Sequence, residues 1–171
     1  MSEESGGGAA SAGPASASAG EKDVPGVIAR PPLIYLTAII AAYVLGWVWV
    51  PPPLPVRLEP VGWGLIAGAL ALMLWAGQEF RKAGTSFHPT EPDTAVIATG
   101  PYRFTRNPLY IGLTLITVGV ALLKNHAWVL VLLAPTLFVM HHGVILREER
   151  YLERKFGAAY TDYKAKVRRW I

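Results

Sequence analysis

Residues 109–146, LYIGLTLITVGVALLKNHAWVLVLLAPTLFVMHHGVIL, decide the fold of this chain. They form two apolar runs, 109–123 and 127–146, which only Lys124, Asn125 and His126 separate. A connection this short joins helices that lie antiparallel and side by side. The stretch therefore predicts a tight helical hairpin whose two outer ends meet on one side of the molecule.

Two further apolar runs, 33–50 and 61–77, precede this hairpin, and none of the four runs contains a charged side chain. At ~1.5 Å per residue the first, second and fourth runs reach across ~30 Å of hydrocarbon, while the third is marginal. The hydrophobic content of 52% is high for a soluble domain. We predict an all-α fold, a polytopic membrane helical bundle of about four transmembrane helices.

Residues 1–30 are an Ala-, Ser- and Gly-rich tail. Such a composition cannot bury enough apolar surface to offset the entropy lost on ordering. The tail also lacks the basic start and apolar centre of a secretory signal. We predict that it is disordered and that residues 31–171 form the membrane domain.

Basic residues are distributed unevenly among the connections. Fourteen of the 16 Lys and Arg residues lie in the tail, in the connection 81–106 or after residue 146, and only Arg57 and Lys124 lie elsewhere. The positive-inside rule then places both termini in the cytoplasm, at the plasma (inner) membrane if the source is bacterial. Because the basic residues flank apolar runs, we expect membrane lipids rather than nucleic acid as their partners.

Small residues indicate where helices approach closely. Gly64 and Gly68 form a Gly-x-x-x-Gly step in the second run. Such a step permits close helix packing in membranes, so we expect these two glycines at a helix interface.

The C-terminal residues 147–171 are amphipathic. Apolar and aromatic side chains recur at helical steps of three and four, at Leu152, Phe156, Tyr160, Tyr163, Val167 and Trp170. Gly157 predicts a break between two shorter helices. We interpret this cytoplasmic segment as a membrane-surface anchor or a cap on the bundle.

A polar island, GPYRFTRNPLYIG at 100–112, precedes the hairpin. Asn107 followed by Pro108 predicts a helix start, with Asn as the cap and Pro at the first helical position. A helix N-terminus beside Arg103 and Arg106 also favours an anion such as a carboxylate or phosphate. The island is a plain helix start, an anion site, or both.

Glu148 and Glu149 follow the fourth run, where the dipole at the end of a helix disfavours negative charge. Arg147 and Arg150 could compensate as ordinary surface pairs. Alternatively, one glutamate receives a cationic group such as an ammonium. A carboxylate opposite an anion-favouring helix start would suit a zwitterion with amino and carboxyl groups.

These motifs resemble a known family. Gly100-Pro101-Tyr102, the stretch 106–112 (RNPLYIG) and the pattern Glu148-Glu149-x-x-Leu-x-x-x-Phe-Gly-x-x-Tyr-x-x-Tyr are similar to the isoprenylcysteine carboxyl methyltransferase and phospholipid methyltransferase family. The resemblance covers residues 80–169.

The resemblance implies an integral membrane methyltransferase that uses S-adenosylmethionine and a membrane-borne acceptor, a lipid amine or a prenylated or carboxylate group. It also implies which positions contact the cofactor: Thr94, Ala95, Val96, Ile97, Tyr102, Asn107, Pro108, Leu109, Tyr110 and Glu148. We expect in-line displacement at the sulfonium methyl, assisted by positioning and desolvation. Arg106 is a candidate to orient acceptor or cofactor, and Glu149 or Tyr110 a candidate base.

Three other interpretations follow from the sequence. His141 and His142 precede the glutamates, but the chain has only four histidines, and the other two lie far from this pair. These are too few ligands for a membrane metal oxidase, so no metal is expected. A non-catalytic protein could use the basic C-terminal segment to bind lipid or a partner. A membrane reductase of related fold would bind NADPH instead.

Overall fold

The computed structural model describes residues 26–50, 53–54, 58–84 and 96–170. They form the helices α1 (Pro31–Val48), α2 (Glu59–Ala83), α3 (Pro108–Leu123), α4 (Ala127–Met140), α5 (Leu146–Phe156) and α6 (Ala158–Lys166). A 3-10 turn, η1 (Gly100–Arg103), precedes α3, and a π turn, η2 (His141–Ile145), joins α4 to α5. The described residues form no β-strand, so the all-α prediction is confirmed. The predicted disorder of the tail concerns residues that lie mostly outside this description.

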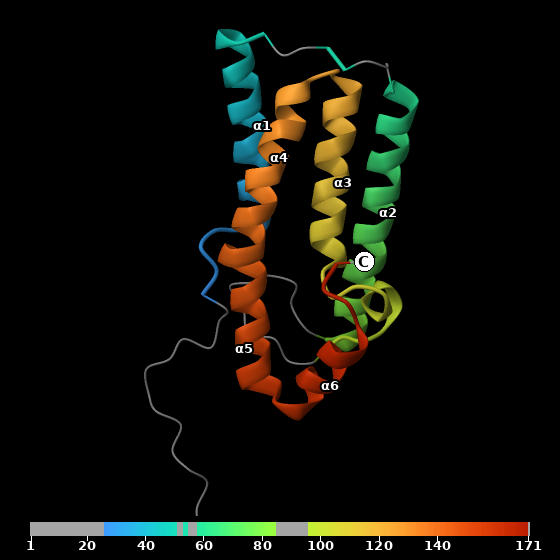
Figure 1. The fold of residues 1–171 in the computed structure, drawn as a ribbon. Helices are drawn as coiled ribbons and strands as arrows, with labels where there is room; N and C mark the ends of the chain where they lie inside the picture. Colours follow the sequence, from blue (N-terminus) through green and yellow to red (C-terminus); the bar gives the residue numbers. More distant parts are fainter. Residues whose placement is uncertain (1–25, 51–52, 55–57, 85–95, 171) are drawn as a thin grey trace, which may run out of the picture.

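The long helices run side by side in one bundle (Figure 1). α1 packs against α4, α2 packs most extensively against α3, and α3 and α4 form the predicted hairpin. Three helices are long and apolar enough to cross a membrane: Pro31–Val48, Glu59–Ala83 and Ala127–Phe156. α3, with 16 residues, is shorter than these three. The protein is therefore a polytopic helical membrane bundle.

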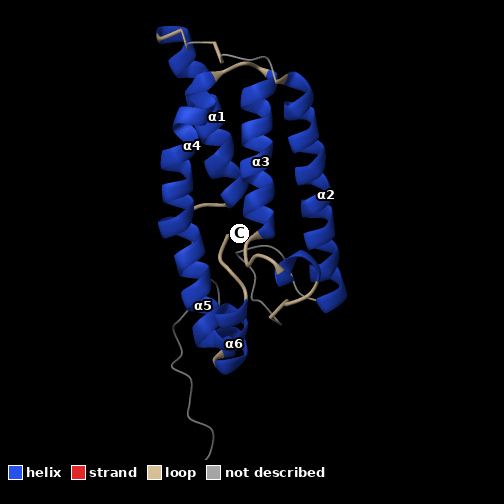
Figure 2. Ribbon diagram, turned by 45° about the vertical axis from the view of Figure 1, so that its right-hand side comes forward, coloured by secondary structure: helices blue, strands red, loops and turns tan. Residues whose placement is uncertain are grey.

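The third long helix continues beyond the apolar run that the sequence predicts. Its 30 residues extend about 45 Å, which exceeds the ~30 Å of hydrocarbon. The excess is α5, whose side chains are mostly charged and which projects from the bundle (Figure 2). Glu148 and Glu149 therefore lie within a continuing helix and not at a helix end, so the expected dipole penalty does not apply.

Helices α2 and α3 approach each other through glycines, but not through the expected ones. A Cβ atom added at Gly62 would lie 2.9 Å from the backbone oxygen of Gly119, and one at Gly119 would lie 2.9 Å from that of Gly62. Gly64 and Gly68 have no atom of another helix within 4 Å of such a position. The predicted Gly-x-x-x-Gly interface was therefore wrong, because these two glycines face outward.

Buried side chains fill the space between α1, α3 and α4 in the half of the bundle that leads to α5. Tyr35, Leu133, Met140 and Val144 form one cluster, against which Tyr110 packs. The chain before α1 lies on η2, where the Ile28 amide donates to the Gly143 carbonyl. This packing fixes the end of the bundle from which α5 projects.

Candidate functional site

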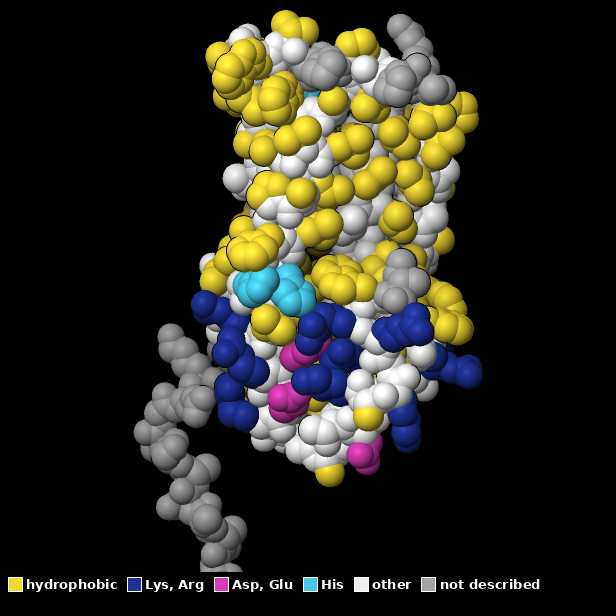
Figure 3. Space-filling model, viewed as in Figure 1, with side chains coloured by type: hydrophobic (Ala, Val, Ile, Leu, Met, Phe, Trp, Pro, Cys, Tyr) yellow, Lys and Arg dark blue, Asp and Glu magenta, His cyan; other side chains and the backbone are white. Residues whose placement is uncertain are grey.

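The charged side chains gather at one end of the molecule, below an apolar body (Figure 3). This end holds η1, the start of α3, α5 and the C-terminal residues (Figure 1). The polar island and the glutamates, which are 36 or more residues apart in sequence, are thus on the same side, as the hairpin predicts.

The loop before α3 is fixed by Glu79 of α2, a residue that is not apparent from the sequence. Thr99 donates a hydrogen bond to its carboxylate, and Lys82 forms an ion pair with it. Gly100 has a φ of +57°, and a Cβ there would lie 2.6 Å from the Glu79 side chain. Only glycine suits this position, because the backbone is in the left-handed region and a side chain would collide with Glu79. η1 then places Tyr102 in a buried position.

Asn107 occupies the position before α3, yet its side chain does not cap the helix. Its Nδ2 donates to the Arg169 carbonyl at 2.8 Å. The Thr105 hydroxyl accepts a hydrogen bond from the Asn107 amide and donates to the same Arg169 carbonyl. The predicted cap was wrong, because Asn107 binds the C-terminal segment instead.

The C-terminal residues return to the polar island. Gly157, with a φ of +52°, separates α5 from α6, so the predicted break is confirmed. After α6 the chain is extended, and the Arg106 amide donates to the Arg168 carbonyl at 2.9 Å. The residues of the predicted surface stripe thus do not form a single helical face on the membrane. Tyr160 is buried, and the Tyr163 hydroxyl donates to the Tyr102 carbonyl at 2.8 Å.

Glu149 is the centre of an ion-pair cluster. Its carboxylate accepts hydrogen bonds from Nε and Nη2 of Arg169, both at 2.8 Å, and its Oε1 lies 3.0 Å from Nη1 of Arg106. The Glu149 side chain is only 6% exposed. Burial by itself raises the pKa of this carboxyl, but the Arg169 hydrogen bonds and the nearby positive charges outweigh it, so the pKa is below its ordinary value. Glu149 is therefore an ionised structural partner.

Arg106 is buried without a full set of hydrogen bonds. Its side chain is 9% exposed, and neither Nε nor Nη1 has a hydrogen-bond partner in the described part of the chain. The 3.0 Å approach to Glu149 is an ion pair without hydrogen-bond alignment. Because buried donors are normally satisfied, these guanidinium nitrogens are candidates to donate hydrogen bonds to a ligand with acceptor atoms, such as a carboxylate.

Glu148 faces the start of α3. Tyr110, in the first turn of α3, donates its phenol hydrogen to Glu148 Oε1 at 2.6 Å. Nearby, burial and the negative charge of Glu149 raise the pKa of Tyr160 to about 12, although Arg106 opposes this rise. Tyr160 therefore stays protonated at neutral pH and acts as a hydrogen-bond donor or acceptor without charge.

The structure brings most of the predicted site residues together and leaves others unplaced. Tyr102, Arg106, Asn107, Pro108, Tyr110, Glu148 and Glu149 lie in or against the connected cluster around the start of α3. Leu109, Val96 and Ile97 are half-buried, and no specific contact assigns them a role. Thr94 and Ala95 lie outside the described residues. Sequence reasoning missed Arg169, which was only one of several basic residues in a polar stretch.

No group of three or more potential metal ligands occurs in the described ranges.

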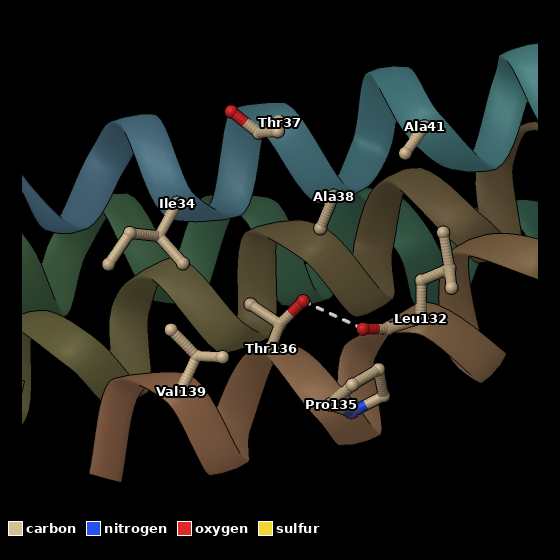
Figure 4. Close-up of a pocket in the computed structure, with 8 residues that line it drawn as sticks. All are labelled: Ile34, Thr37, Ala38, Ala41, Leu132, Pro135, Thr136 and Val139. Atoms are coloured by element: carbon tan, nitrogen blue, oxygen red, sulfur yellow. Dashed lines mark hydrogen bonds between the residues drawn. The ribbon is translucent and has the colours of Figure 1, made fainter. Parts of the chain in front are cut away.

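A separate cavity of about 250 Å³ lies between α1 and α4, lined by apolar residues with Thr37 and Thr136 (Figure 4). The Thr136 hydroxyl donates its hydrogen bond to the Leu132 carbonyl. None of the residues that line this cavity is charged or belongs to the cluster around Glu149, so the cavity is not part of that site.

Fold and cluster together define a polytopic membrane protein with a buried polar cluster at its charged end. The sequence model of the phospholipid methyltransferase family matches residues 58–159, more than half of the chain. The chain belongs to this family. No solved structure matches it significantly.

Three relatives are similar to parts of the chain. A protein-S-isoprenylcysteine O-methyltransferase of Saccharomyces cerevisiae is 35% identical over 77 residues, which are 45% of this chain and 32% of that protein. The Schizosaccharomyces pombe enzyme of the same name is 30% identical over 95 residues, 56% of this chain and 39% of that protein. An uncharacterized protein of Haemophilus influenzae is 42% identical over 65 residues, 37% of this chain and its own full length. The chain thus spans about a third of the length of the two yeast enzymes.

Proposed function

We propose that this chain is an S-adenosylmethionine-dependent methyltransferase that acts on a lipid or other hydrophobic acceptor from the bilayer. The observation that carries the proposal is the buried Arg106 before the start of α3: its Nε has no hydrogen-bond partner in the described part of the chain, and its Nη1 has only the ion pair with Glu149. Family membership and the methyltransferase names of the two yeast relatives support it.

The residues at this end suit a zwitterionic ligand. Arg106 offers positive charge and a free Nε–H donor to a carboxylate, and Glu148, which accepts a hydrogen bond from Tyr110, offers negative charge to an ammonium. The amino acid part of S-adenosylmethionine carries both groups. When bound, this cofactor supplies an activated methyl group on a sulfonium sulfur.

The protein's own contribution is to hold and orient. Glu149 is engaged by Arg169 and Arg106, which leaves it ill suited to accept a proton. We therefore assign it a positioning role: it fixes the Arg106 guanidinium and the C-terminal segment. The apolar body beside the charged end lets an acceptor remain in the bilayer while its polar head reaches the site.

Calorimetry on the purified full-length protein in detergent tests cofactor binding. S-adenosylmethionine is expected to give a saturable heat and NADPH none. Arg106→Gln should weaken binding about 10- to 100-fold, since a hydrogen bond to a charged group contributes about 1.5–3 kcal/mol. Arg103→Gln is the matched control, because Arg103 is in the same loop but exposed. Heat with NADPH alone would favour a reductase, and heat with neither would favour a non-catalytic protein.

The acceptor is identified by incubating membranes with methyl-labelled cofactor and analysing the products by mass spectrometry. Label in lipid supports a lipid amine acceptor, and label confined to protein contradicts one.

The cytoplasmic location of both termini remains part of the proposal. Because the chain has no cysteine, the variants Lys124→Cys and Arg150→Cys each carry a single thiol that reports on orientation in the membrane. A membrane-impermeant maleimide added outside the cell should label the Lys124→Cys variant and not the Arg150→Cys variant.

A further inference from the structure

The π turn η2 changes which side chains share a face of the long helix. In a regular helix, residues seven apart lie on the same side, so His141 would lie over Glu148. A π turn adds one residue to a turn. His141 is the first residue of the π turn that joins α4 to α5. With the added residue, His141 lies on the same side of the helix as Glu149, eight residues later. π turns inside α-helices are frequent at functional sites.

The electrostatic surroundings of His141 agree with this alignment. The charges that act on its imidazole are those of Arg169, Glu149 and the adjacent His142. Figure 3 shows histidine side chains where the apolar body meets the charged end, on the same face as basic and acidic side chains. His141 therefore faces the cluster that holds Arg106, about 12 Å nearer the bilayer than Glu149 at ~1.5 Å per residue.

The two histidines differ in what their rings contact. His142 is exposed, its Nδ1 lies 3.1 Å from the Phe138 carbonyl, and its ring lies against Phe138 with centroids 4.3 Å apart. His141 is half-buried, and its ring nitrogens form no hydrogen bond within the described part of the chain. Its ring contact is with His142, edge to face. The ring nitrogens of His141 thus remain available to a ligand, whereas the Nδ1 of His142 lies against the Phe138 carbonyl.

We propose that His141 accepts the proton that an ammonium acceptor must lose before methyl transfer. This inference rests on the proposed function and deepens it, because a carboxylate acceptor has no such proton. The acceptor N–H bond breaks and its proton passes to an imidazole nitrogen. The freed nitrogen lone pair then forms the N–C bond to the methyl group as the S–C bond breaks, and that electron pair stays on sulfur.

Three charged or titratable groups lie near His141. They are His142 on the same turn, Glu149 of α5 and Arg169 of the C-terminal segment. Glu149 and Arg169 are paired with each other and keep their charges over the range in which histidine titrates. The turnover rate should therefore fall on acidification as His141 becomes protonated and can no longer accept a proton.

The test compares His141→Gln with His142→Gln in the full chain, reconstituted in phosphatidylcholine bilayers that contain phosphatidylethanolamine. Methyl transfer from labelled S-adenosylmethionine is followed from pH 5.5 to 9. For His141→Gln we expect a loss of kcat of about 100-fold or more, the size typical of a general base. Its pH profile should lose the histidine step, while its calorimetric affinity for S-adenosylmethionine stays within twofold. His142→Gln should keep both rate and profile.

Other outcomes overturn the inference in distinguishable ways. If His141→Gln keeps the rate and profile, or loses cofactor affinity together with the rate, His141 is not the proton acceptor. If the wild type methylates a fatty acid added to these bilayers but not phosphatidylethanolamine, the acceptor class is wrong. Failure of the wild type to bind S-adenosylmethionine would instead contradict the proposed function itself.

Discussion

At the residue scale, the arrangement around Glu149 shows how a buried carboxylate can organise a site without reacting. Two guanidinium groups approach it, and the bidentate contact with Arg169 fixes the last residues of the chain. Arg106 is thereby held, and its Nε has no hydrogen-bond acceptor among the residues that the structure describes. Removing one partner from such a buried pair is costly because the remaining charge stays desolvated.

This cluster predicts an acid-sensitive C-terminal segment. The folded pKa of Glu149 is below its ordinary value of 4.5. Its stabilising contribution is therefore present above about pH 4.5 and is lost as the pH falls through the lower folded value. Glu149→Gln should destabilise the neutral protein by about 3 kcal/mol and remove this acid step. Limited proteolysis of the C-terminal segment against pH measures the release.

Glu153→Gln serves as the comparison variant. Glu153 is also in α5 and pairs with Lys164, but its side chain is 32% exposed. Because exposed pairs contribute about 1 kcal/mol or less, it should keep the acid step. Equal proteolysis of both variants at every pH would contradict the assigned role of Glu149.

At the element scale, the contact between α2 and α3 depends on backbone proximity. Gly119→Ala places a methyl group 2.9 Å from the Gly62 carbonyl oxygen, which cannot move aside as a flexible side chain would. We expect a loss of about 1–3 kcal/mol in the free energy of unfolding, the usual cost of overpacking. Thermal unfolding in detergent measures it. Gly64→Ala, on the same pair of helices, should be neutral or slightly stabilising.

The elements themselves were largely predictable. Uninterrupted apolar runs mark the helices in the apolar body, and the three residues 124–126 force the hairpin. The glycine interface was not predictable in detail, because a Gly-x-x-x-Gly step does not specify which side of the helix meets a neighbour. The extension of the fourth helix to Phe156 was missed because the apolar run ends at Leu146, although the backbone continues as helix.

At the scale of the whole molecule, the site is assembled from three distant segments: the residues before α3, α5 and the chain after α6. Sequence motifs marked the first two as candidate segments of the site. The role of the third could not be predicted, since Arg169 differs from its basic neighbours only in being directed onto Glu149. Asn107 was misread for the same reason, because its local preference for capping is overridden by the tertiary contact with Arg169.

The shortness of α3 has a consequence for the surrounding lipid. Its 16 residues extend about 24 Å, so Asn107 starts the helix at a depth that lipid tails would otherwise occupy. Such hydrophobic mismatch is relieved by local thinning of the bilayer, which brings lipid headgroups down toward the polar cluster. Methyl transfer in reconstituted bilayers should therefore be faster with shorter acyl chains than with longer ones, whereas cofactor affinity should not change. A rate that does not depend on acyl-chain length would contradict local thinning of the bilayer at α3.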